Sequence, residues 1–78
     1  MPTLSINHQG LSRLRHVARP DSPAGATDAE LARRIGINQS TLYRVLCDRA
    51  APGPKFIAGV LKEFGPKWFG EVFRIVED

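Results

Sequence analysis

The stretch from Thr27 to Cys47 constrains the fold more than any other part of the chain. Thr27 can cap a helix, and Glu30, three residues later, can reach back to the Thr27 amide, which completes a capping box. Gly36 stands where a helix ends in the left-handed conformation, which glycine adopts without a Cβ penalty. Asn38 is a good N-cap for a following helix over residues 39–47. The pattern predicts two short helices that meet across a tight turn, a helix-turn-helix over residues 27–47.

Apolar spacing and helix breakers predict the elements on either side of this motif. A one-sided helix is expected from Gly10 to Ala18, and the proline- and glycine-containing loop 20–26 ends it. Pro54 suits the first position of a later helix that stops at residues 65–66. For the tail, residues 66–78, we favour a helical turn over 66–71 and a strand over 72–77, although helical spacing also fits. Residues 3–6 alternate polar and apolar side chains, which permits another strand.

The helices supply enough apolar residues for a small core. The residues expected on their inner faces are Leu11, Leu14, Val17, Leu31, Ile35, Leu42, Val45, Phe56, Ile57, Val60, Leu61 and Phe64. Cys47, at the end of its helix, is expected to pack beside them. The apolar tail must then either cap this core or bury itself against a second copy. Its strand could pair with residues 3–6 of the same chain; between chains, its partner could be the same strand of a twin or the exposed aromatic face of a short helix at Trp68 and Phe69. The hypothesis we prefer is a homodimer whose interface consists of Trp68, Phe69, Val72, Phe73 and Ile75.

Size and composition exclude several classes of protein. A chain of 78 residues, 42% apolar and 24% charged, is expected to form one small globular domain over residues 1–78. The apolar runs are too short to span a membrane, and no signal-peptide pattern opens the chain, so we expect a cytoplasmic protein. His8 and His16 have no further ligand at metal-binding spacing, and no catalytic triad is visible. We therefore expect no enzyme activity, no metal, no cofactor and no small-molecule ligand.

Basic side chains gather in the first three quarters of the chain. Residues 1–60 carry eight basic and four acidic side chains, whereas residues 61–78 carry three and four, for a net charge of +3. An anionic partner such as nucleic acid suits this distribution.

The segment from Thr27 to Leu46 resembles the helix-turn-helix family of phage Cro and repressor proteins and their bacterial relatives, the xenobiotic-response-element regulators. The resemblance covers roughly residues 10–65, includes Pro54-Lys55-Phe56, and the chain is similar in size to Cro. It implies a mostly α, four- to five-helix, lambda-repressor-like domain. Whether the termini form a short two-stranded sheet is not decided by the resemblance. Asp28 departs from the family, which often has a phosphate-holding Gln at this position, and the loop before it looks longer than usual.

The predicted helix 39–47 presents base-reading side chains on its outer face. Gln39 can pair bidentately with adenine and Arg44 with guanine. The resemblance implies base contacts from Asn38, Gln39, Ser40 and Arg44, and contacts to the DNA backbone from Thr41, Tyr43, Arg49 and Lys55. We expect a transcriptional regulator that binds double-stranded DNA as a dimer over two half-sites. The alternative is a protein-interaction module of the same fold, such as an antitoxin or accessory factor. RNA binding is disfavoured, since no exposed aromatic pair on a predicted sheet is available for stacking on bases.

Overall fold

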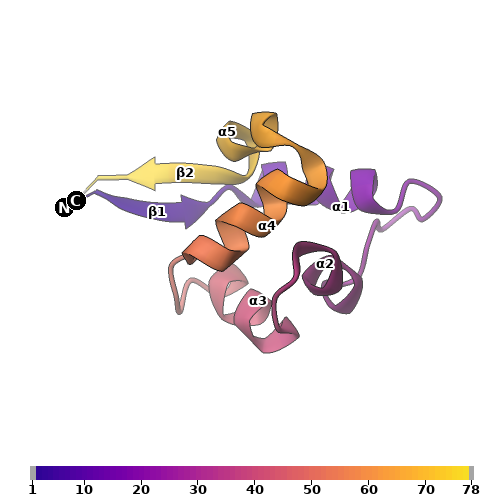
Figure 1. The fold of residues 1–78 in the computed structure, drawn as a ribbon, viewed down its shortest axis with the longest axis horizontal. Coiled ribbons are helices and arrows are strands. Elements are labelled where there is room, and N and C mark those ends of the chain that lie inside the picture. Colours follow the sequence, from indigo (N-terminus) through magenta and orange to yellow (C-terminus); the bar gives the residue numbers. More distant parts are fainter. Residues whose placement is uncertain (1, 78) are drawn as a thin grey trace.

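The chain folds into a cluster of helices from which a two-stranded ribbon projects (Figure 1). The computed structural model describes residues 2–77; Met1 and Asp78, the ends of the predicted domain and of the tail, lie outside the described residues. The elements are β1 (Thr3–Ile6), α1 (His8–Ala18), α2 (Asp28–Ile35), α3 (Gln39–Leu46), α4 (Pro54–Phe64), the 3-10 turn η1 (Pro66–Trp68), α5 (Phe69–Val72) and β2 (Phe73–Val76). The predicted fold class, mostly α with a short sheet from the termini, is confirmed.

The ribbon joins the two ends of the chain. β1 and β2 pair antiparallel, with Leu4 opposite Ile75 and Ile6 opposite Phe73. The Asn7 amide donates to the Val72 carbonyl oxygen at 2.7 Å and continues the pairing to the base of the ribbon. Of the partners that the sequence allowed for the tail strand, the one within the chain is therefore the partner observed. The strand begins one residue later than predicted, because Val72 is the last residue of α5.

The core lies between the helices and the base of the ribbon. Its most deeply buried side chains are Leu11, Leu14, Leu31, Leu42, Val45, Phe56, Val60 and Val72. Phe73 packs edge-on against Phe56, with ring centroids 5.8 Å apart, so the tail caps the core. The prediction for Val17 is wrong: 53% of this residue is exposed, because the buried stripe of α1 consists only of Gly10, Leu11 and Leu14.

Two glycines allow helices to approach closely. A Cβ at Gly59 of α4 would overlap the carbonyl oxygen of Ile35, the last residue of α2. A Cβ at Gly10 of α1 would overlap the carbonyl oxygen of Glu71 in α5. Backbone atoms cannot yield as a flexible side chain can, so these positions fix how α2 and α5 sit on the rest of the fold.

Candidate nucleic-acid interface

Local hydrogen bonds hold α2 and α3 in the predicted helix-turn-helix arrangement. The Thr27 hydroxyl accepts from the Glu30 amide at 3.2 Å, and the Thr27 amide donates to the Glu30 carboxylate at 3.3 Å. Gly36 adopts the left-handed conformation with φ 89°, and the amides of Gly36 and Ile37 both donate to the Ala32 carbonyl. The Asn38 side chain then caps α3 by accepting from the Ser40 amide at 3.1 Å. The capping box, the turn glycine and the second cap are all confirmed.

One face of α3 is buried and the other is open to solvent. Leu42 and Val45 are 0% and 2% exposed, which fixes the helix against the core. The four predicted base-contacting residues, Asn38, Gln39, Ser40 and Arg44, are all exposed, as are Thr41 and Tyr43. The side-chain oxygen of Asn38 is occupied by the Ser40 amide and hydroxyl, so its NH2 group is the part available to a ligand. The outer face of α3 is therefore a continuous polar surface.

Tyr43 projects from the middle of this surface. It is 56% exposed. The neighbouring Cys47 raises the pKa of Tyr43 above its ordinary value of 10.0, first through a side-chain hydrogen bond and then through a charge interaction. A phenol is protonated at neutral pH even without this shift, so the Tyr43 hydroxyl can act as a donor to an anion. Cys47 itself is exposed, contrary to the prediction that it packs, because it caps α3 one residue beyond the last turn that faces the core.

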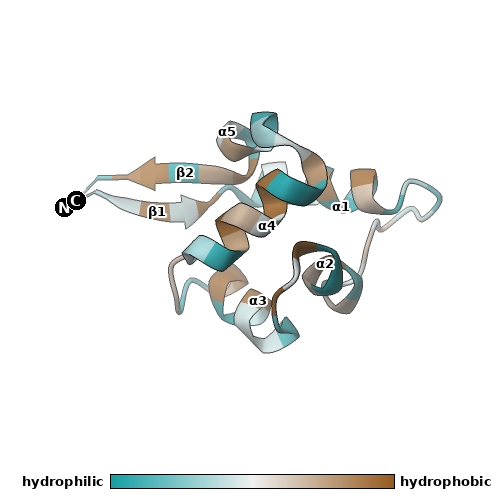
Figure 2. Ribbon diagram, viewed as in Figure 1, coloured by the Kyte–Doolittle hydropathy of each residue, from teal (hydrophilic) through white to brown (hydrophobic). Residues whose placement is uncertain are grey.

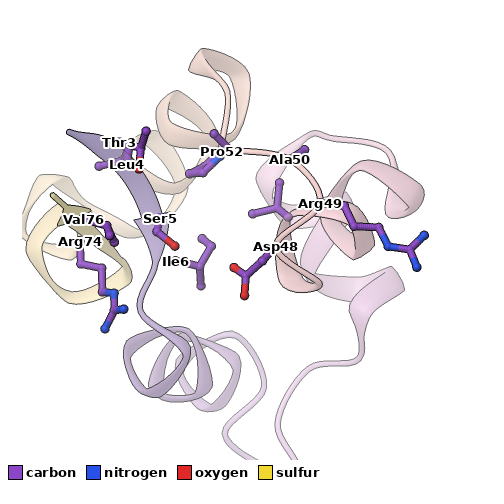
Figure 3. A pocket seen from close by; sticks show the side chains of 12 residues that line it. Thr3, Leu4, Ser5, Ile6, Asp48, Arg49, Ala50, Pro52, Arg74 and Val76 are labelled. Carbon is purple, nitrogen blue, oxygen red and sulfur yellow. The ribbon is translucent and has the colours of Figure 1, made fainter. Parts of the chain in front are cut away.

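Arg49 and Lys55 extend the polar surface beyond α3. Arg49 lies in the loop between α3 and α4, where its amide donates to the Arg44 carbonyl at 2.9 Å, and Lys55 is in the first turn of α4; both are exposed. Figure 3 shows Arg49 directed away from a furrow of about 470 Å³ that separates this loop from β1. Ser5 and Asp48 come from opposite sides of that furrow. The predicted phosphate-contacting cation thus points outward from the loop.

Ion pairing divides the cations of the molecule into two groups. On α1, Arg13 pairs with Glu71 at 2.7 Å and Arg15 with Asp28 at 2.6 Å, and Arg19, which follows α1, pairs with Glu30 at 2.7 Å. Arg34 of α2 pairs with Glu63 of α4 at 2.8 Å. Within residues 2–77, no ion pair involves the cations of α3, of the following loop or of the first turn of α4, which are Arg44, Arg49 and Lys55. Four other cations, Arg33, Lys62, Lys67 and Arg74, also lack an ion pair within residues 2–77. Positive charge that is not internally compensated therefore borders the exposed face of α3 but is not confined to it.

Sequence reasoning missed the position of Asp28 relative to α3. Its side chain lines a hollow of about 430 Å³ together with Asn38, Gln39, Ser40 and Tyr43. The sequence marked Asp28 only as a departure at the start of α2. That departure was the available signal, because the first residue of α2 lies beside the first turn of α3 once the two helices cross.

The residues predicted for a dimer interface separate into buried and exposed ones. Val72 and Phe73 are 0% and 3% exposed and belong to the core of one chain, whereas Trp68 is half-buried. Phe69 is 41% and Ile75 68% exposed. The structure therefore leaves mainly Phe69 and Ile75 as apolar area that a second copy could cover.

Other classes of site find little support in the part of the chain that is described. No group of three or more His, Cys, Asp and Glu side chains among residues 2–77 is placed to hold a metal ion. Of the helices described, none has the length and apolar character needed to cross a membrane.

In comparisons with known proteins, no family model, curated protein or solved structure matches the chain. The resemblance to Cro and repressor proteins stays a prediction from the residues of the helix-turn-helix.

Proposed function

We propose that this protein is a sequence-specific binder of double-stranded DNA and a transcriptional regulator of the Cro and repressor type. The observation that carries the proposal is the polar, fully exposed face of α3, set in a helix-turn-helix and bordered by cations without ion-pair partners among the described residues. A recognition helix in this arrangement fits the major groove, which admits one α-helix and displays a distinct pattern of donors and acceptors for each base pair.

The side chains of this surface divide by the part of DNA that they suit. The Gln39 amide matches the donor and acceptor of adenine, and the Arg44 guanidinium matches the two acceptors of guanine. Ser40 and the NH2 group of Asn38 add shorter contacts from the first turn. Thr41, Tyr43, Arg49 and Lys55 supply hydroxyl and cationic donors for phosphate oxygens, which position the protein on the duplex without reading its sequence.

Selection of bound sequences from a random DNA pool, followed by binding measurements across a salt series, tests this function. We expect one enriched motif and an affinity that falls steeply with salt, by about 0.9 logarithmic units per phosphate contact for each tenfold rise. The alternative, a protein-interaction module, gives no enriched DNA sequence and little salt-dependent DNA affinity. That result would exclude the regulator.

The ribbon provides a route to a homodimer, which the reading of two half-sites requires. Because Asn7 and Val72 form a hydrogen-bonded pair and such pairs alternate along an antiparallel ladder, the backbone groups of Ile75 point away from β1. Figure 2 shows that the outer half of β2, beyond the helices, is hydrophobic. We propose that β2 pairs with β2 of a second copy, which buries Ile75 and Phe69. Dimers of helix-turn-helix proteins bind two half-sites about 34 Å apart.

A point substitution tests the dimer better than removal of the tail, since deleting residues 67–78 would also remove Val72 and Phe73 from the core. Ile75→Lys should shift sedimentation of the intact chain from dimer to monomer and weaken operator binding. Val17→Lys is the matched control, because it places the same charge at another exposed apolar residue, near the end of α1. A wild-type protein that stays strictly monomeric, both free at concentrations well above the operator Kd and on DNA, excludes the dimer.

A further inference from the structure

A hollow between the start of α2 and the first turn of α3 contains one acidic side chain. Asp28, the first residue of α2, lines it together with Asn38, Gln39, Ser40 and Tyr43, and the volume is about 430 Å³. The other four residues are neutral and lie on the surface proposed to face DNA. A carboxylate at this position is unexpected on a surface that binds a polyanion, so it calls for a specific role.

Arg15 holds the Asp28 carboxylate in place. One terminal nitrogen of the guanidinium lies 2.6 Å from Asp28 Oδ1, and the other donates to the carbonyl oxygen of Ala26 at 3.0 Å. The side chains are 19% exposed for Arg15 and 37% for Asp28, so the cation is largely covered while the carboxylate reaches solvent. The pair restrains the orientation of Asp28, and within residues 2–77 no hydrogen bond or ion pair engages Oδ2, which remains an acceptor on a residue that lines the hollow.

An ionised carboxylate accepts hydrogen bonds and donates none, which limits what it can contact on DNA. It repels phosphate oxygens, and it repels the acceptors N7 and O6 of guanine and O4 of thymine. Cytosine presents the N4 amine to the major groove and no acceptor of its own, which is the pattern that Asp and Glu side chains read. Adenine suits a carboxylate less well, because its N6 amine stands beside the N7 acceptor.

We propose that Asp28 is a specificity-determining residue that accepts a hydrogen bond from the N4 amine of a cytosine next to the bases read by α3. This inference rests on the proposed DNA-binding function. Asp28 favours cytosine through one hydrogen bond and disfavours guanine and thymine through repulsion, so discrimination comes from both attraction and penalty. Arg15 acts as a positioning residue, because it touches the carboxylate and not the DNA.

The test is selection from a random DNA pool with the wild type, Asp28→Ala and Asp28→Asn, each checked for folding by thermal unfolding. We expect the wild type to enrich cytosine at one position, and Asp28→Ala to lose about 5- to 150-fold of preference there while the rest of the motif remains. Asp28→Asn keeps the shape and an oxygen for Arg15 but adds donors, so it should admit guanine or thymine at the same position. This second variant keeps the test decisive if Asp28→Ala does not fold.

Asp21→Asn is the matched control for charge. Asp21 lies in the loop before α2, has an 82% exposed side chain, pairs only loosely with Arg19 at 3.8 Å and does not line the hollow. Removing its charge should raise affinity for all sequences at low salt and leave every base preference unchanged. If the Asp28 variants behave in this way too, the carboxylate acts through general repulsion and the proposed role is wrong. If the wild type enriches no sequence at all, the DNA-binding function itself fails, which is a different result.

Discussion

The two flanks of the helical cluster both carry arginines, but they use them differently. On the α1–α2 flank the guanidinium groups of Arg13, Arg15 and Arg19 are each paired with a carboxylate from another element or loop. On the α3–α4 flank, Arg44 and Arg49 make no ion pair with any residue in the range 2–77. Apart from Arg33 of α2, which forms no ion pair within residues 2–77, the first flank pairs its arginines with carboxylates, whereas the second presents Arg44 and Arg49 outward. Substitutions should therefore separate stability from binding according to the flank on which they fall.

The largest effect is expected from Arg44→Ala and Gln39→Ala on the α3–α4 flank. If each side chain pairs bidentately with a base, each alanine should cost about 1–3 kcal/mol of discrimination at one base position. The free energy of unfolding should stay almost unchanged, because both residues are exposed. Site selection and quantitative binding with each variant check this. Two variants that keep the wild-type site at wild-type affinity would show that α3 is not the recognition helix.

On the α1–α2 flank, Thr27→Ala should lower stability without changing base preference. It removes the hydroxyl that accepts from the Glu30 amide and so breaks the capping box, at a cost of about 1 kcal/mol in the free energy of unfolding. Thr41→Ala is the control, since Thr41 is an exposed hydroxyl on α3 that caps no helix. Denaturant unfolding should separate the two variants, and DNA binding should show the reverse order of effects. Equal stability of both variants would contradict the role assigned to the capping box.

Phosphate contacts are expected to have a smaller and less selective effect. Arg49→Ala or Lys55→Ala should weaken binding to all sequences and reduce the slope of log affinity against log salt by about one unit. Arg13→Ala, which removes a cation already paired with Glu71, should leave that slope unchanged. Binding isotherms at several salt concentrations make the measurement. A changed base preference with an unchanged slope would count against a backbone role for Arg49 or Lys55.

Where one local requirement decides the structure, the sequence was sufficient to predict it. The capping box at Thr27 and the positive φ at Gly36 each depend on a few neighbouring residues, and both were predicted residue by residue. Long-range packing decided the rest. Val17 has core spacing, yet no neighbouring element covers it, and the sequence of β2 is equally compatible with a partner strand from the same chain or from a second one. Burial of Phe73 against Phe56 accompanies the pairing within the chain, and no local pattern encodes that contact.

The candidate site shows the same division. The exposure of Gln39, Ser40 and Arg44 follows from the helical period once Leu42 and Val45 are assigned to the core. The position of Asp28 beside them depends on how α2 crosses α3, and its fixation depends on Arg15, thirteen positions earlier in the chain. Neither relation can be obtained from residue spacing, because each joins elements separated by a turn or a loop.

The smallest expected effect is a pH dependence of stability that arises on the α1–α2 flank. The ring nitrogens of His16 lie 2.9 Å from the carbonyl oxygens of Ser12 and Pro23, and only the doubly protonated ring can donate to both. These bonds, first the one to Ser12 and then the one to Pro23, raise the pKa of His16 above its ordinary value of 6.5. The charged ring therefore stabilises the fold fully below pH 6.5, and this contribution is lost as the pH rises through the higher folded pKa. Denaturant unfolding from pH 5 to 9 should show the loss in the wild type and in the control His8→Gln, but not in His16→Gln, while DNA base preference stays constant. An identical pH profile for His16→Gln and the wild type would show that the bridge from α1 to the loop does not contribute to stability.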